Sequence, residues 1–172
     1  MTTNDLVTRR LIIRSTRERD GAFCLSVWLD DEMGRYLADP PREKADDDEL
    51  NFAVGIETQE GWYPFVAVSK ETGAYIGTCS AVPSDDQTCW DLGYCVHRAY
   101  WRRGYATEMI RALIDFGYRS GGRTFTASVA KENVASNAVL QNLGFHAERE
   151  GSFRKRGTDV VYPEYVYRLD LE

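Results

Sequence analysis

The stretch that decides the fold reads Asp91-Leu-Gly-Tyr-Cys-Val-His-Arg-Ala-Tyr-Trp-Arg-Arg-Gly-Tyr-Ala-Thr-Glu108. Its first part alternates as a strand does, and we expect that strand over Cys89 to Val96. Its second part opens a helix, because apolar residues then recur at the 3.6-residue period of one helical face. These residues are Ala106, Met109, Ile110, Leu113, Ile114 and Gly117. The sequence therefore predicts a strand, a short basic glycine loop and a helix in direct succession.

The loop between this strand and this helix has the features of an anion cradle. A helix leaves its first N–H groups without intrahelical partners, and Gly104 lets another molecule approach the backbone closely. A pyrophosphate there would gain from the helix dipole and from Arg102 and Arg103. The competing interpretation is a plain strand-to-helix turn with two surface arginines. A dinucleotide fingerprint does not compete, because G-x-G-x-x-G is absent.

Composition narrows the class of protein. The chain has 172 residues, of which 43% are hydrophobic, and 21 Lys+Arg against 27 Asp+Glu give a formal net charge of −6. These values predict one soluble globular domain over residues 1–172 that buries a core without disulfides. A protein that binds DNA neutralises its phosphates with Lys and Arg, and the excess of acidic residues here argues against that, so no DNA partner is expected. The chain shows neither an apolar run of about 20 residues nor a signal-peptide pattern, so we expect a cytoplasmic protein without a membrane partner.

The cysteines and histidines do not form a metal-binding pattern. Cys24, Cys79, Cys89 and Cys95 contain no C-x-x-C pair, and the two histidines lie far apart in the sequence. We therefore expect no metal, and we expect the cysteines to be small core residues.

Further elements are predicted on both sides of the central stretch. Before it, we expect a strand from Thr8 to Arg14, a helix capped by Ser15-Thr16, and a second helix capped by Asp30-Asp31-Glu32. The run Asp46 to Glu49 predicts the solvated first turn of a third helix. Strands at 62–68 and 74–82 should form an antiparallel meander with 89–96. After it, we expect a strand at 124–129, a helix at 135–143 ended by Gly144, and a last strand at 160–171 behind a turn at 154–159.

Two segments carry a family resemblance. The segment from Leu92 to Glu108 resembles the acyl-CoA motif of the GNAT N-acetyltransferases, and the segment Glu132-Asn-Val-Ala-Ser-Asn-Ala-Val-Leu-Gln-Asn-Leu-Gly-Phe145 resembles the family's second signature. With Leu11-Ile-Ile-Arg14, they are similar to the ribosomal-protein-alanine N-acetyltransferase (RimJ/RimL-like) subgroup. The resemblance implies an α+β fold, with a mostly antiparallel twisted sheet that splays near its centre and helices on both faces. It also implies acetyl-CoA as co-substrate, bound in the splay.

The resemblance assigns cofactor contacts residue by residue. The phosphates of acetyl-CoA would be held by the amides of Arg102, Arg103, Gly104, Tyr105, Ala106 and Thr107. The pantetheine arm would pair with the strand edge at Tyr94 and Val96, and Asn133 and Asn137 would reach the cofactor from the other side. A backbone N–H near Val96 would polarise the thioester carbonyl.

The catalytic acid of many family members is missing. They carry a tyrosine where this chain has Leu140. Ser136 is then the candidate acid that protonates the leaving thiolate, and the alternative is that it caps the helix it begins. Asp91 is the candidate base, and the alternative is a strand-edge carboxylate that hydrogen-bonds a loop. His97, at the strand end, is interpreted as structural.

The sequence thus predicts an acetyl-CoA-dependent N-acetyltransferase acting on an amine, with a protein or peptide N-terminal α-amine as the main hypothesis. At pH 7 about a tenth of an α-amine is neutral, against roughly one part in 2,500 of a lysine amine, so the α-amine needs no strong base. The alternatives are a small amine (a polyamine, an antibiotic or an amino acid) or a non-catalytic acyl-CoA-binding module. Acceptor pockets in such folds come from the segment Asp20 to Gln59 and from the final hairpin. The sequence leaves the acceptor, the acyl-chain preference and homodimer formation open.

Overall fold

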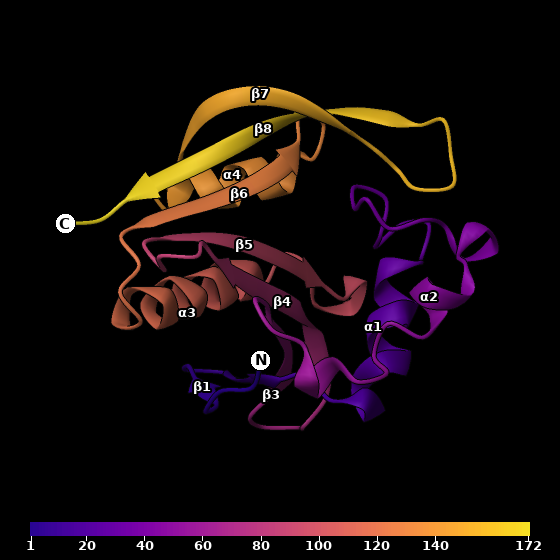
Figure 1. Cartoon of the computed structure of the whole chain (residues 1–172), viewed down its shortest axis with the longest axis horizontal. Helices are drawn as coiled ribbons and strands as arrows, with labels where there is room; N and C mark the ends of the chain where they lie inside the picture. The colour runs from indigo at the N-terminus through magenta and orange to yellow at the C-terminus, as the bar shows by residue number, and fades with distance from the viewer.

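The computed structural model describes residues 1–172 and contains one eight-stranded sheet with helices packed on both faces (Figure 1). The strands lie in the order β1-β2-β3-β4-β5-β6-β8-β7, and all neighbours are antiparallel except β5 and β6. The predicted α+β architecture is confirmed. The strands are β1 (Leu6–Val7), β2 (Leu11–Ser15), β3 (Tyr63–Ser69), β4 (Tyr75–Pro83), β5 (Cys89–Val96), β6 (Thr124–Ala130), β7 (His146–Arg154) and β8 (Val161–Asp170).

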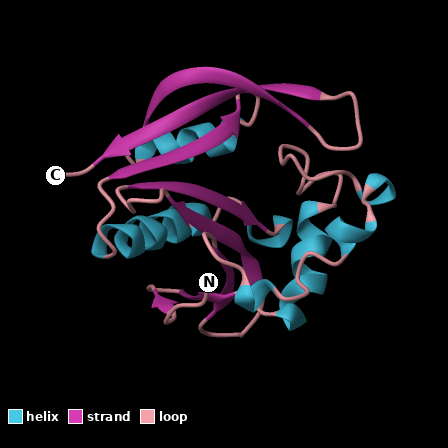
Figure 2. Ribbon diagram, in the orientation of Figure 1, coloured by secondary structure: helices cyan, strands magenta, loops and turns pink.

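Four α-helices surround the sheet (Figure 2). They are α1 (Gly21–Trp28), α2 (Asp47–Leu50), α3 (Tyr105–Arg119) and α4 (Val134–Asn142), with 3-10 turns at Glu18–Asp20, Arg42–Lys44, Ile56–Thr58 and Arg98–Tyr100. Residues of β4 alternate between the two faces: Thr78 accepts a hydrogen bond from Trp28 of α1, while Cys79 lies in the core that α3 covers. No helix combines the length and apolar character that crossing a membrane requires.

The core lies between α3 and the sheet. The predicted face of α3 is confirmed, because Met109, Ile110, Leu113 and Gly117 are all buried. A Cβ on Gly117 would come within 2.7 Å of the Phe125 ring, so only glycine lets the helix pack this closely. Cys24 and Cys79 are buried as predicted, but Cys89 and Cys95 are only partly buried, and all four are free thiols.

The predicted splay at the centre of the sheet is also present. Strands β5 and β6 pair only between Cys89–Asp91 and Thr124–Thr126, although β5 continues to Val96 and β6 to Ala130. Beyond Asp91 the two strands diverge (Figure 1). Helix α4 begins just after β6, so the splay is bordered by the free edge of β5 and the N-terminal end of α4.

Two predicted helix caps are wrong. The hydroxyl of Ser15 accepts from the Thr3 amide instead of capping a helix. Asp30 Oδ1 accepts from the amides of Glu32 and Met33, which makes a turn and no helix, because short carboxylates compete for nearby backbone donors. The predicted turn at Asp46 to Glu49 is confirmed as the start of α2, with a reciprocal capping box.

The sequence predicts a final hairpin but marks no bounds for its first strand, β7. Eight of its nine residues are exposed, so its sequence lacks the alternation that marks a half-buried strand. It pairs with β8, and the loop of this hairpin lies on the same side of the molecule as α2 (Figure 1). Before it, α4 ends as predicted: Gly144 has φ +92°, and the Phe145 amide donates back to Leu140.

Candidate active site

The loop before α3 presents six consecutive backbone N–H groups that have no acceptor within the protein. They belong to Arg102, Arg103, Gly104, Tyr105, Ala106 and Thr107, and the next amide, Glu108, donates to Gly104. Arg102 and Gly104 both have positive φ, +61° and +77°. Left-handed residues at a helix start turn successive amides toward one concave site, which is an anion-binding nest. A non-glycine residue rarely adopts this conformation, so strain at Arg102 points to a functional loop.

An ion pair from the start of the chain holds the loop in place. Arg10 Nη1 donates to the Arg103 carbonyl at 2.8 Å, and its guanidinium lies 4.0 Å from the centre of the Tyr105 ring. Arg10 Nε also pairs with Glu108 at 2.7 Å. Burial opposes ionisation of Glu108, but hydrogen bonds from Thr8 and Arg10 hold its pKa below the usual value. The guanidinium thus offsets a carboxylate that would otherwise repel phosphate at the helix start.

The two arginine side chains of the loop are available to bind an anion. Arg102 and Arg103 are exposed and form no ion pair, and the Arg103 guanidinium lies 5.8 Å from the centre of the Tyr100 ring. These side chains and the amide nest fit the pyrophosphate of CoA.

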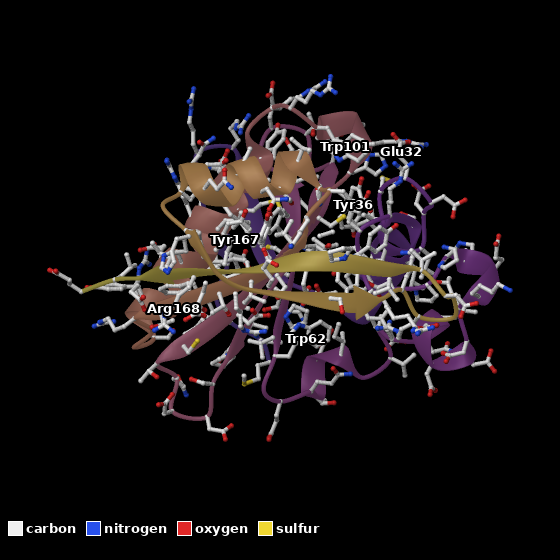
Figure 3. The ribbon with its side chains drawn as sticks, turned by 90° about the horizontal axis from the view of Figure 1, so that it is seen from above. Glu32, Tyr36, Trp62, Trp101, Tyr167 and Arg168 are labelled. Carbon is white, nitrogen blue, oxygen red and sulfur yellow. The ribbon has the colours of Figure 1, made fainter.

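The free edge of β5 continues this binding surface. The His97 amide donates to β4, so alternation along the strand points the amides of Tyr94 and Val96 toward the splay. The Trp101 indole donates to the Val96 carbonyl at 2.7 Å and ties the loop to this edge (Figure 3). The Val96 N–H stays available to a ligand carbonyl.

On the other side of the splay, the predicted residues at the start of α4 differ in their hydrogen bonds. Asn133 is the N-cap and accepts from the Ser136 amide at 3.3 Å, so the alternative that Ser136 caps the helix is wrong. The Asn137 amide donates to the carbonyls of Ala130 and Asn133, and it accepts from Tyr167. Asn137 is therefore buried, and its hydrogen bonds join α4 to β6 and β8. Its predicted contact with the cofactor stays a prediction.

Ser136 is joined across the splay to β5. Its hydroxyl lies 2.7 Å from the Tyr94 hydroxyl, and either group can be the donor. Burial raises the pKa of Tyr94 to about 12, while its bond to Ser136 opposes the shift. At neutral pH both hydroxyls carry protons. Leu140, where many relatives place a tyrosine, is fully buried in the core.

Asp91 lies at the last paired position before the splay. Its Oδ1 accepts from Thr126 Oγ1 of β6 at 2.7 Å. Partial removal from water raises its pKa, and the Thr126 bond opposes this. The side chain keeps exposed surface, so it can accept a proton from a bound molecule.

A pocket of about 350 Å³ opens on the opposite face of β4 and β5 from α3. It is lined by β5 at Gly93 and Cys95, by aromatic residues of the α1–α2 region and by Asp39. Asp91 is not among its lining residues. The sequence predicts that the acceptor pocket is formed by the segment 20–59 and the final hairpin. It does not single out Asp39 or the aromatic residues of this pocket, because they belong to no motif.

The family model of the acetyltransferase (GNAT) domain matches residues 10–146, so the chain belongs to this family. Among its relatives, the uncharacterized protein YkkB of Bacillus subtilis (strain 168) is 30% identical over 146 residues, which are 82% of this chain and 84% of the relative.

Two solved structures share the fold at low identity. The ribosomal α-N-protein acetyltransferase RimL, in complex with coenzyme A, has a TM-score of 0.77 with 16% identity and covers 98% of both chains. The spermidine N-acetyltransferase of Vibrio cholerae, in complex with CoA and spermine, has a TM-score of 0.79 with 14% identity and covers 95% of this chain and 96% of that one. By its family, the chain is a GNAT-type acetyltransferase with acetyl-CoA as its co-substrate.

Proposed function

We propose that this enzyme transfers an acetyl group from acetyl-CoA to the N-terminal α-amine of a protein or peptide, as in the RimJ/RimL-like subgroup. The observation that carries the proposal is the chemistry at the splay. Among the paired residues of β5 and β6, Asp91 alone carries a carboxylate. Burial raises its pKa above the ordinary value, but a carboxylate is still a weak base. An acceptor that is already partly neutral at pH 7 suits such a site, and an α-amine is that acceptor.

In this proposal the chain's residues divide the work along the splay. The amides of residues 102–107, with Arg102 and Arg103, hold the phosphates, and the β5 edge at Tyr94 and Val96 pairs with the pantetheine arm. The Val96 N–H polarises the thioester carbonyl, because a fixed donor stabilises developing negative charge by a few kcal/mol. Asn133 supports the cofactor from the start of α4.

Two side chains move protons. Asp91 accepts a proton from the ammonium of the acceptor, and Thr126 orients its carboxylate. Ser136 delivers a proton to the thiolate of CoA as the thioester bond breaks. The Tyr94 hydroxyl, 2.7 Å away, keeps Ser136 in position and stays protonated at neutral pH.

The proposal is tested by measuring CoA thiol release from acetyl-CoA with a panel of acceptors. The panel contains peptides with a free N-terminus, the same peptides with a blocked N-terminus and an internal lysine, and spermine. We expect turnover with the free N-termini alone. Turnover with spermine alone would assign a small-amine acetyltransferase, which the limited pocket volume of about 350 Å³ also accommodates. CoA binding without turnover of any amine would indicate a binding module.

A further inference from the structure

The pocket beside β4 and β5 has aromatic walls. Trp28, at the end of α1, and Phe52, just after α2, pack edge to face with ring centres 4.7 Å apart. Trp62 lines the same pocket from the segment before β3 (Figure 3). All three side chains are half-buried, so each keeps surface for a ligand.

The indole groups differ in their hydrogen bonding. Trp28 Nε1 donates to Thr78 at 2.9 Å, whereas Trp62 Nε1 has no acceptor in the protein. Trp28 is thereby fixed as a wall, and Trp62 keeps a free donor. Aromatic faces bind both apolar groups and cations.

Asp39 is the only charged residue among the fourteen that line this pocket. Burial raises its pKa, although the nearby Arg156 and Lys155 oppose the shift. Burial and the charge of Asp39 together raise the pKa of the Cys95 thiol to about 12. Asp39 and Cys95 of β5 line the same pocket.

The final hairpin holds Asp39 rigidly. Lys155 Nζ is buried and donates to the carbonyls of Gly34, Leu37 and Asp39, at 2.8, 3.1 and 2.6 Å. Arg156 Nη2 lies 3.3 Å from Asp39 Oδ1, and Arg156 Nε pairs more closely with Glu49 at 2.7 Å. Arg156 is thus shared between two carboxylates, which leaves Asp39 with capacity for another cation. Its position is preorganised, and preorganisation strengthens binding.

Gly93 lines the pocket and belongs to β5, whose free edge borders the splay. A Cβ at this residue would lie 2.9 Å from Ser80 Oγ, so a side chain there would have to displace the Ser80 hydroxyl, which lines the pocket too. Gly93 lies between Asp91 and Cys95 on the same face of β5, one step from Tyr94. An acceptor that enters the pocket beside Asp39 can therefore move its amine along this face toward Asp91.

We propose that this pocket selects an acceptor whose first residue combines a single ammonium group with a bulky apolar side chain. Asp39 attracts the ammonium as the peptide enters, and Trp28, Phe52 and Trp62 enclose the apolar side chain. The amine then passes to the splay, where it loses its proton to Asp91. This inference rests on the proposed acetylation of N-terminal α-amines, and it specifies which N-termini are used. One carboxylate among aromatic walls matches one positive charge, whereas a polyamine needs several carboxylates along its length.

The first experiment compares kcat/KM for otherwise identical peptides that begin with Phe, Leu, Ser or Asp, together with 2-phenylethylamine and spermine. We expect Phe and Leu to exceed Ser by about tenfold and Asp by more, because an acidic side chain would meet Asp39. Equal rates for all four peptides would overturn the selectivity while leaving α-amine acetylation intact. Turnover of 2-phenylethylamine but of no peptide would support the pocket assignment and contradict the proposed function.

The second experiment uses variants of the pocket. Trp62→Ala should raise KM for the Phe peptide by roughly 5- to 30-fold, the range that a lost cation–π and stacking contact predicts, and Trp62→Phe should restore most of it. Asp39→Asn should raise KM by about tenfold, while the matched control Asp48→Asn, an exposed carboxylate on α2 without partners, should not. CoA affinity, measured by calorimetry, should be unchanged in all of them. Unchanged KM in folded Trp62→Ala and Asp39→Asn would remove this pocket from acceptor binding.

Discussion

Gly104→Val places a β-branched side chain at a residue whose φ is +77°. A non-glycine residue in the left-handed region costs about 1–2 kcal/mol, and a β-branched one belongs at the upper end. The ideal Cβ position meets only Arg10 Nη2, at the ordinary contact distance of 3.6 Å. The change therefore strains the backbone without a clash in the free protein, and we expect the variant to fold.

The strain emerges in one of two measurable forms. If the loop keeps its conformation, the free energy of unfolding falls by about 1–2 kcal/mol. If the loop relaxes, the six amides lose their common direction, and a loss of about 2 kcal/mol in binding raises the Kd for CoA by about 30-fold. The loss in the free energy of unfolding and the loss in the free energy of CoA binding should together reach about 2 kcal/mol. The valine side chain adds to the loss in binding, because it stands where the pyrophosphate approaches the backbone.

Calorimetric titration with CoA and denaturant unfolding separate these two losses. The matched control is Gly121→Val at the other end of α3, where φ is +104° and no atom lies within 4 Å of the Cβ position. The control should lose stability and keep its CoA affinity. Whether the loop of the Gly104→Val protein keeps its conformation or relaxes, the valine side chain would stand where the pyrophosphate approaches the backbone. A folded Gly104→Val protein with unchanged CoA affinity would therefore refute the assignment of this loop to the cofactor.

Four further changes test other parts of the account. Arg103→Ala should weaken the binding of CoA more than the binding of phosphate-free pantetheine analogues, and the difference should shrink with added salt. Equal losses of affinity for both ligands would mean that Arg103 acts through packing. Asp91→Asn should lower kcat/KM at pH 7 by about 10²-fold if Asp91 removes the ammonium proton, and the loss should become smaller as pH rises toward the pKa of the amine. A loss of less than tenfold would mean that the α-amine enters already neutral, and a large loss independent of pH would make Asp91 structural. Ser136→Ala should lower kcat at least tenfold, while CoA affinity stays unchanged. Asp20→Asn should lower the free energy of unfolding by about 2 kcal/mol at pH 7 and by little at pH 2.

The Asp20 prediction follows from its surroundings. Asp20 is fully buried, and burial opposes its ionisation, but hydrogen bonds from Arg14, Tyr75 and the Arg17 amide hold its pKa at about 2. A carboxyl with a depressed pKa stabilises the fold above its ordinary value near pH 4 and loses that contribution as pH falls toward 2. Chemical denaturation of both proteins across this pH range measures the difference. A constant difference down to pH 2 would contradict this origin of the stability.

The sequence predicts the elements whose pattern is local. The face of α3 and the bounds of β5 follow from periodicity, and the amide cradle follows from the glycine and arginines before the helix. The antiparallel meander of β3, β4 and β5 follows from their short connections, whereas the splay was implied by the family resemblance alone. Strand β7 carries no alternation because it lies at the sheet edge with almost every residue exposed.

The proposed acceptor pocket could not be derived in the same way. Trp28, Asp39 and Trp62 are far apart in the sequence, and none belongs to a motif. Lys155 of the final hairpin binds the loop that carries Asp39, and Thr78 of β4 binds Trp28. Asn137 is the opposite case: it lies inside a motif that the sequence reveals, but its amide donates to β6 and so joins α4 to that strand. Contacts between distant segments decide these roles, and one sequence does not encode them locally.

The central claim is that this site acetylates an α-amine. The most direct measurement uses one peptide that begins with a free Phe α-amine and carries one internal lysine, incubated with acetyl-CoA and the enzyme, with the acetyl group located by fragment mass spectrometry. The account predicts acetylation of the α-amine alone, at a rate that falls when Asp91 is replaced by Asn. Acetylation of the lysine with an untouched N-terminus would contradict it.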